Sequence, residues 1–540
     1  MLRLSNLSVP LDATDQDFRR AAAKALSVQE ARIIQCRLAR QAVDARDKRA
    51  VHWVVSLDVT GRWTSEEEEA LIKRGGQVQR ATQYSAPTVA RVKRPAHAPL
   101  VVGMGPAGLF AALRLAQAGW NPIIWERGKP VDQRERDVAA FQSGGALDVE
   151  SNVQFGEGGA GAFSDGKLTT GIRDPRREEV LRVFAECGAP REILTSAKPH
   201  IGTDRLPEAV RALREKILSL GAEIHYGTRL TGLAARSGCI RGARALRYSG
   251  QGGTREFDNV ELNTEHVILA VGHSARDTLR MLADMGVLLQ AKPFAVGVRI
   301  EHSQAWLNGA QYGSYGAHPA LGAAEYKLAA HMPNGSDIYT FCMCPGGTVV
   351  AAASEHGGVV VNGMSRWARD GVNANSALLV GVSEDRFADR PLSGIDFQRG
   401  LEEAAFREGG GGFRAPAQRV QDFLARRASK GPGEIEATYP RGVEWCDLDA
   451  CLPRFIADSL RQGLIRLNQM LPGFASPDAV LTAVESRSSS PARVARDGSY
   501  QTSVAGLYAA GEGAGWAGGI VSSAVDGLRA AEAILILNSV

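Results

Sequence analysis

The pattern of apolar and polar positions over residues 1–75 changes period several times, from the two-residue repeat of strands to the helical repeat and back. A segment of this kind is expected to form a small α+β layer, and a ferredoxin-like module is the fold class that it suggests. The elements predicted within it are strands at Leu2–Val9, Ile33–Val43 and Val51–Val59, a helix at Asp15–Leu26 and a second helix that begins at Ser65.

A polar stretch without periodicity, residues 76–97, follows this module and contains Pro87 and Pro95. It is predicted to be a linker, because proline interrupts regular elements and nothing in the stretch repeats at strand or helix spacing. From residue 98 the pattern becomes an apolar strand, a glycine-rich turn, a helix and a second apolar strand. This order is typical of a doubly wound α/β domain, whose first part is predicted to cover residues 98–290.

Residues 291–475 have a different texture, with short strands, Gly/Pro turns and a few helices such as Asp396–Arg407 and Pro453–Met470. The strand, glycine-rich turn and long helix return in residues 476–540. The predicted fold class is therefore α/β. A discontinuous doubly wound (Rossmann-like) domain carries an inserted α+β domain and the small N-terminal α+β module.

A dinucleotide fingerprint, GxGxxG, stands directly after the first apolar strand of the α/β domain and opens a helix. Gly103 permits the tight turn, Gly105 lets the backbone approach a pyrophosphate, and Gly108 lets helix and strand pack closely. Glu126, at the end of the next strand, can accept hydrogen bonds from the adenosine ribose. An acid at this position disfavours the 2′-phosphate of NADP.

The far end of the chain favours FAD over NAD. A strand there ends in Gly511–Glu512, and Gly518–Gly519 then opens the helix Ile520–Ile536. Glu512 can hydrogen-bond the ribityl chain, and the positive end of the helix dipole would point at the pyrimidine edge of the flavin. That dipole favours the negative charge that develops there on reduction.

A loop between these segments holds five glycines in the eleven positions 156–166. Its backbone N–H groups can surround an anion or a flat ring, so it is expected to lie along the pyrophosphate and the flavin. The candidate cofactor contacts are Gly103, Gly105, Pro106, Ala107, Gly108, Glu126, Arg127, Arg134, Gly158, Gly159, Ala160, Gly161, Ser164, Lys167, Gly272, Gly511, Glu512, Gly519 and Ile520.

Seven specific motifs are spread over the chain: Asn152–Lys167, His200–Asp204, Gly272–Asp277, Phe294–His302, Phe341–Gly347, Asn362–Ser365 and Glu485–Pro491. In these motifs the chain resembles the glutathione-reductase-type FAD/NAD(P)-binding superfamily. More narrowly, it resembles a family of predicted FAD-dependent dehydrogenases whose substrate is not established. The resemblance implies a non-covalent FAD, a nucleotide domain assembled from separated segments and an inserted substrate domain. It supplies no reaction.

The candidate catalytic residues include a close pair of cysteines, Cys342 and Cys344. They could be structural, could lie beside the flavin without redox change, or could form a redox dithiol. A redox role would need a nearby positive charge to lower a thiol pKa. Metal binding is disfavoured, because no second CxxC or histidine pair accompanies them.

Three further side chains are candidates for catalysis. Arg487 could anchor an anion in two-pronged fashion, or could pair with Glu485 or join two domains. His273 could act as an acid or base, or could be a hydrogen-bonded structural residue. Lys167 could stabilise reduced flavin or simply pair with Asp165.

Charge and composition refine this picture only slightly. The 63 basic and 59 acidic residues nearly balance, although residues 1–97 carry 17 basic and 11 acidic ones. The seven cysteines suggest no disulfide framework, and no signal peptide or spanning helix is evident, so a cytoplasmic protein without membrane contact is expected.

The predicted function is that of an FAD-dependent oxidoreductase transferring a hydride between flavin N5 and an unidentified organic substrate. A second GxGxxG after a strand is missing, so NAD(P)H, if it is the donor, would dock transiently. The basic N-terminal module leaves a flavin-dependent RNA-modifying enzyme as an alternative, although it lacks a stacking strip and nucleic acid is disfavoured. A flavin-binding sensor without turnover is the third alternative. The oligomeric state is left open.

Overall fold

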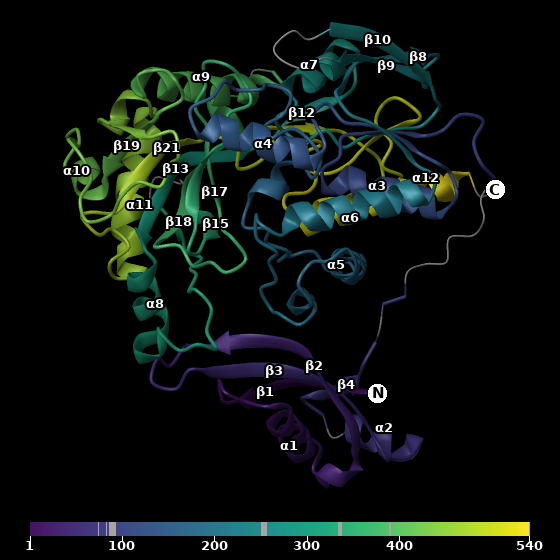
Figure 1. The fold of residues 1–540 in the computed structure, drawn as a ribbon, viewed down its shortest axis with the longest axis vertical. Helices are drawn as coiled ribbons and strands as arrows, with labels where there is room; N and C mark the ends of the chain where they lie inside the picture. Colours follow the sequence, from purple (N-terminus) through teal and green to yellow (C-terminus); the bar gives the residue numbers. More distant parts are fainter. Residues whose placement is uncertain are drawn as a thin grey trace.

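The chain forms three units, and Figure 1 shows the N-terminal module set below the other two. The computed structural model describes residues 1–73, 75–82, 84–85, 93–249, 256–332, 337–387 and 390–538. Pro87, on which the predicted linker partly depends, lies outside these residues. Among the helices described, none is long and apolar enough to cross a bilayer.

The N-terminal module is a four-stranded sheet with the order β2-β3-β1-β4, in which all neighbouring strands are antiparallel. The connectivity β-α-β-β-α-β is the ferredoxin-like pattern. Strand β4 lies inside the predicted linker, because its three residues are too short and polar to give a sequence signal. The elements are β1 (Leu2–Val9), α1 (Asp15–Leu26), β2 (Ile33–Asp44), β3 (His52–Gly61), α2 (Ser65–Lys73) and β4 (Val78–Arg80).

Edge strand β2 attaches this module to the rest of the chain. The amide of Gln41 donates to the carbonyl of Thr195 at 2.8 Å, and the amide of Ala197 donates back to Gln41 at 2.8 Å. The hydroxyl of Tyr315 in turn donates to the carbonyl of Arg49 at 3.4 Å. The module therefore touches both of the larger units.

A five-stranded parallel sheet with the order β23-β11-β5-β6-β7 forms the centre of the second unit. The chain begins at β5, runs to one edge and returns on its other side, so the sheet is doubly wound. Strands from four separated segments complete it. They are β5 (Leu100–Val102), β6 (Ile123–Trp125), β7 (Glu223–His225), β11 (Val267–Leu269) and β23 (Leu507–Ala509).

Helices α3 and α12 pack side by side on one face of this sheet (Figure 1), with α5 and α6 against them in one apolar cluster. The other face is covered by α7 and the three-stranded sheet β8–β10. These elements are α3 (Pro106–Gln117), α4 (Val131–Gln142), α5 (Arg176–Glu186), α6 (Leu206–Ser219), β8 (Thr228–Arg236), β9 (Cys239–Ser249), β10 (Glu256–Asn263), α7 (Arg276–Asp284) and α12 (Ile520–Leu537).

The inserted unit is built on a seven-stranded sheet with the order β14-β15-β18-β13-β21-β19-β20. Its elements are β13 (Phe294–Ser303), α8 (Gln304–Tyr312), β14 (Ala329–His331), β15 (Asp337–Cys344), β16 (Thr348–Ala351), β17 (Val361–Met364), β18 (Asn373–Val382), α9 (Ser393–Glu408), β19 (Ala415–Arg419), α10 (Val420–Leu424), β20 (Val443–Trp445), α11 (Arg454–Met470) and β21 (Val480–Glu485).

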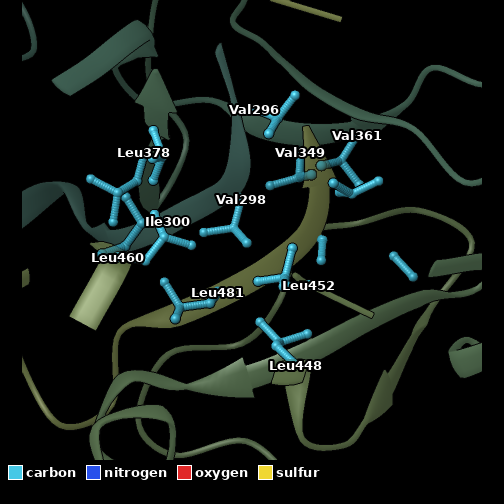
Figure 2. Packing of buried hydrophobic residues seen from close by; sticks show 14 of the residues in the cluster. Val296, Val298, Ile300, Val349, Val361, Leu378, Leu448, Leu452, Leu460 and Leu481 are labelled. Atoms are coloured by element: carbon cyan, nitrogen blue, oxygen red, sulfur yellow. The ribbon is translucent and has the colours of Figure 1, made fainter. Parts of the chain in front are cut away.

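Strand β13 is buried on both faces, and its first half, Phe294–Val298, is continuously apolar. Figure 2 shows Val298 and Ile300 of β13 beside Leu481 of β21, with Leu378 and Leu460 packed near them. Because β21 pairs with β13 and β19, this sheet extends to Glu485, past the predicted domain end at residue 475. The short ribbon of β12 (Leu289–Ala291) and β22 (Ala492–Val494) then joins the two units.

Candidate flavin site

The glycines of the fingerprint fall into two kinds. Gly103 has φ +99°, and a Cβ there would lie 2.5 Å from the carbonyl oxygen of Ala270. A Cβ on Gly108 would lie 1.8 Å from the carbonyl oxygen of Gly103. On Gly105, by contrast, the nearest atom to a Cβ would be the Cα of Gly159, at 3.8 Å. Gly103 and Gly108 are therefore required by packing, whereas Gly105 borders open space.

Four separated segments meet at this turn. The distances from a Cβ built on each glycine measure how closely they approach. A Cβ on Gly159 would lie 2.9 Å from the Cα of Gly105, and one on Gly161 would lie 3.1 Å from Ile520. A Cβ on Gly511 would lie 2.8 Å from Ala107, and one on Gly513 would lie 2.5 Å from the carbonyl oxygen of Gly272. The glycine loop, the fingerprint turn and the segments at Gly272 and Gly511–Ile520 thus share one site.

The residues present fit FAD. A Cβ on Gly272 or Gly518 would meet no described atom within 4 Å, and one on Gly519 would meet only the hydroxyl of Ser522 at 3.9 Å. Helices α3 and α12 begin here after Gly105 and Gly519, and neither has a side-chain cap. Their first-turn N–H groups can therefore serve a pyrophosphate and the flavin edge.

Glu126 organises the turn from beneath. Its buried carboxylate accepts hydrogen bonds from the amides of Met104 at 2.7 Å, Gly128 at 2.8 Å and Gly156 at 3.1 Å. A carboxylate has about four acceptor sites, so one more bond from a ribose hydroxyl is possible. The ribose contact stays a prediction, and the structure adds a second role in holding the loop.

Arg134 and Arg127 support the site rather than line it. Arg134 is fully buried, and its guanidinium donates to the carbonyls of four loop residues, Asn152, Val153, Gly156 and Glu157. Burial lowers the pKa of Arg134 to about 10. Arg127 pairs with Glu150 at 2.8 Å and with Asp277 at 3.0 Å. Both cations are therefore occupied by protein groups.

Arg134→Lys is expected to lower the free energy of unfolding by about 1.5–3 kcal/mol, since one ammonium cannot reach the four carbonyls that the planar guanidinium serves. It should also weaken FAD binding, measured by flavin fluorescence on titration. Arg136→Lys, at an exposed position of the same helix, is the matched control. Equal FAD affinity in the two variants would contradict this role.

The remaining loop residues mostly shape the loop. The amide of Gly158 donates to the carbonyl of Met104 at 2.8 Å, which ties the loop to the fingerprint. The hydroxyl of Ser164 donates to the carbonyl of Gly161 at 2.7 Å. Ala160 begins a short 3-10 turn, and Pro106 is the first residue of α3. The predicted contacts of these residues with FAD stay predictions.

Two titratable groups meet at the expected ribityl and flavin end. Nδ1 of His273 lies 3.6 Å from the carboxylate of Glu512. Burial, assisted by Arg487 and Arg276, lowers the pKa of His273 to about 3, so the ring is neutral. Its Nε2 is buried and has no hydrogen-bond partner among the described residues. Burial also raises the pKa of Glu512 to about 7.

Arg487 belongs to a buried ion network. Its guanidinium donates to both carboxylate oxygens of Glu402, at 2.9 Å each, and to Glu355 at 3.0 Å. Arg276 binds the same Glu402 at 2.7 and 2.9 Å. The domain contact that the sequence allowed is thus present, but Glu485 is not the partner, since it pairs with Arg299 at 3.1 Å. These bonds occupy the guanidinium, which speaks against the anion anchor.

The cysteine pair lies at an irregularity of β15. Cys342 has φ +42°, and the register with β18 shifts between Phe341 and Cys344. The Nζ of Lys167 donates to the carbonyl of Met343, between the two cysteines. Arg299 donates to the carbonyl of Cys342 at 3.0 Å and lies 3.6 Å from Sγ of Cys344. The positive charges that a reactive thiol needs are therefore present.

Sequence reasoning missed several partners in this region. Lys167 does not pair with Asp165, whose carboxylate binds Arg369 at 3.0 Å. The Nζ of Lys167 lies 4.0 Å from the carboxylate of Glu325 instead. Arg299 was also missed, although the sequence held a signal: Arg299 and Glu301 interrupt an otherwise apolar strand. Charged residues in a buried strand usually have buried partners.

Comparisons with known proteins agree with this site. The family model described as "FAD-dependent protein, C-terminal domain-like" matches residues 293–488, and a domain of unknown function matches residues 1–60. An uncharacterized protein of Clostridium beijerinckii is 42% identical over 544 residues, covering 99% of this chain and 98% of that one. A thiamine thiazole synthase of Aeropyrum pernix is 30% identical over 197 residues, covering 36% of this chain and 60% of that one.

Among solved structures, a quinol fumarate reductase chain of E. coli is similar with a TM-score of 0.38 and 12% identity, over 82% of this chain and 70% of that one. Together, the glycine-built site and the matching family model define an FAD-dependent flavoprotein. The chain belongs to the same family as the Clostridium beijerinckii protein, and its residues 293–488 match the model of FAD-dependent proteins. The FAD cofactor predicted from the sequence is confirmed by this match.

Proposed function

We propose that this protein transfers a hydride between flavin N5 and a small organic substrate held against the inserted domain. The observation that supports this most directly is the approach of strand β15 to the flavin end of the site. The Nζ of Lys167, on the glycine loop, donates to the carbonyl of Met343, on β15. This contact between the loop and the insertion supports a substrate position between the insertion and the cofactor.

FAD, when bound, supplies the hydride chemistry, and the chain supplies binding, orientation and exclusion of water. The first turn of α3, beyond Gly105, would hold the pyrophosphate, and Glu126 would hold the ribose. Glu512 would hold the ribityl chain. The N-terminus of α12 at Ile520 would face the pyrimidine edge and favour negative charge there.

The substrate side carries polar groups of both signs. Lys167 and Lys198 both approach Glu325, and Arg369 pairs with Asp165. Charges of both signs around Lys167 support a polar substrate that offers both hydrogen-bond donors and acceptors. The partner class we propose is therefore a polar small molecule. NAD(P)H would be a transient electron donor, because a second fingerprint after a strand is missing from the sequence.

Anaerobic addition of NADH or NADPH to the yellow holoprotein is expected to bleach the visible flavin band, and a substrate should then restore it. In Lys167→Gln the rate of bleaching or recovery should fall by about tenfold or more, the effect of losing one charge-assisted hydrogen bond of about 1.5–3 kcal/mol. Lys430→Gln, at an exposed position, is the control. If neither nicotinamides nor a metabolite panel changes the band while a chemical reductant does, the proposal fails.

A further inference from the structure

Strand β15 contains one residue more than its partner between two paired positions. Phe341 pairs with Ala377 and Cys344 with Asn375, so three steps on β15 face two on β18. On a regular strand, residues i and i+2 lie on the same face and are about 6.5–7 Å apart. The Cβ atoms of a disulfide must lie about 3.5–4.5 Å apart, so a regular strand holds two such cysteines too far apart. The left-handed Cys342, with φ +42°, turns the strand at this bulge. The two thiol groups consequently affect each other's pKa.

The two thiols have different environments. Cys344 is buried, and its Sγ also lies 3.3 Å from the carbonyl oxygen of Cys342. Cys342 is only partly buried. The hydrogen bond from Cys344, followed by the charges of Lys167 and Arg299, lowers the pKa of Cys342 to about 6 against the effects of burial and Asp165. The same bond and burial raise the pKa of Cys344 well above its usual value.

Cations from two units hold the bulge. Lys167 of the glycine loop binds the carbonyl of Met343, and Arg299 of β13 binds that of Cys342. The carboxylates that act on these thiols are those of Asp165, Glu485 and Glu512. Asp165 is paired with Arg369 at 3.0 Å, and burial raises the pKa of Glu485 and that of Glu512 to about 7, which weakens their opposition to a thiolate.

We infer that Cys342 and Cys344 form a redox pair that cycles between dithiol and disulfide by exchange with a thiol–disulfide compound. Cys342, as the accessible thiolate, attacks a disulfide R–S–S–R, forming a mixed disulfide and releasing R–S⁻. Cys344 then attacks the Cys342 sulfur, closes the internal disulfide and passes its proton to the second leaving R–S⁻, which departs as R–SH. The protein pair loses two electrons, and R–S–S–R gains them.

This inference rests on the proposed function for its place at the flavin end, and it names thiol–disulfide compounds as the class of redox partner. Cys446 and Cys451 provide the internal comparison. Burial raises the pKa of Cys446 to about 11 and that of Cys451 still further, so both should stay inert. The contrast between these two pairs makes the inference testable within one chain.

Equilibration of the reduced holoprotein with oxidised glutathione, followed by thiol counting in denaturant, is expected to remove two of the seven free thiols. Mass analysis should place the loss of two hydrogen atoms in the peptide that holds Cys342 and Cys344. Cys342→Ser should abolish this loss. Cys344→Ser should instead trap one glutathione on Cys342, because the resolving thiol is gone. Cys446→Ser should behave like the parent.

Alkylation by iodoacetamide at pH 7 should be at least about tenfold faster at Cys342 than at Cys446, given the difference in thiolate fraction. Retention of both thiols after equilibration, or an undiminished loss in Cys342→Ser, would overturn the inference. Thiol counting on protein stripped of FAD separates it from the proposed function. If the thiols cycle but neither nicotinamides nor metabolites bleach the flavin, only the proposed function is refuted. If these compounds bleach the flavin but the thiols stay reduced, only this inference is refuted.

Discussion

Replacement of Gly105 by valine is expected to give a folded protein that no longer binds FAD. The backbone at Gly105, with φ −72° and ψ −178°, suits any L-residue. A Cβ there would approach only the Cα of Gly159, at 3.8 Å, so the chain itself has room for a side chain. That room is the space that a pyrophosphate must enter, and the isopropyl group would fill it.

The size of the effect should follow the size of the side chain. In Gly105→Ala one methyl group crowds the cofactor, at a cost of about 1–3 kcal/mol, or about 5- to 150-fold in affinity. Gly105→Val should weaken binding by a further factor of about ten or more, so that the protein is purified colourless. The measurements are the ratio of flavin to protein absorbance and the dissociation constant from fluorescence titration.

Two controls separate loss of cofactor from loss of fold. Gly400→Ala, in an open position of α9, should leave the flavin content unchanged. Gly108→Ala should instead damage the fold, because its Cβ would lie 1.8 Å from the carbonyl oxygen of Gly103. The apo form of Gly105→Val should melt like the apo parent. A yellow Gly105→Val protein would contradict the position of the cofactor.

Local signals explain why much of the α/β domain could be predicted. The strand, glycine turn and helix around Gly105 form within one short segment, so their spacing is visible in the sequence. The helix at Asp15–Leu26 was likewise predicted with its observed bounds, since an amphipathic repeat is local. Strand β4 gave no such signal, because three polar residues acquire their conformation only by pairing with β1.

The parts of the site that were missed depend on contacts between distant segments. The bulge at Cys342 arises from the register between β15 and β18, which no local pattern encodes. Pairing with Glu485 was one alternative for Arg487, yet its partner Glu402 comes from α9 of the insertion. Arg134 was expected to contact the cofactor, but its guanidinium is surrounded by four loop carbonyls. Nothing in the local sequence reveals these partners.

Removal of the Glu402 carboxylate is expected to destabilise the protein more than any other single ion-pair change discussed above. Glu402 is fully buried and accepts bonds from Arg276, from Arg487 and from the hydroxyl of Ser486 at 2.7 Å. Glu402→Ala would leave two buried guanidinium groups with only the partly exposed Glu355 as counter-charge. Breaking a buried pair in this way costs about 3–5 kcal/mol, measurable by denaturant unfolding.

Glu403→Ala is the matched control, because Glu403 lies on the same helix but, among the residues that the structure describes, pairs only with Arg399, at 2.8 Å near the surface. Its loss should cost about 0.3–0.5 kcal/mol. A cost for Glu402→Ala as small as this would show that the network does not stabilise the fold. Glu402→Gln keeps the shape and removes the charge, so it separates the ionic loss from the cavity that alanine leaves.

The pH dependence gives an independent test of the same network. Although burial disfavours its charge, Arg487 and Arg276 hold the pKa of Glu402 far below its ordinary value. A carboxylate with a depressed pKa in the folded state stabilises the fold fully above its unfolded pKa of about 4.3, and this contribution is lost as the pH falls below that value. The difference in unfolding free energy between the parent and Glu402→Gln should therefore be constant from neutral pH down to about pH 5 and should shrink at lower pH.

Because Arg276 belongs to the FAD domain and Glu402 to the insertion, the same variant should also release FAD faster, since the two units that enclose the cofactor would separate more easily.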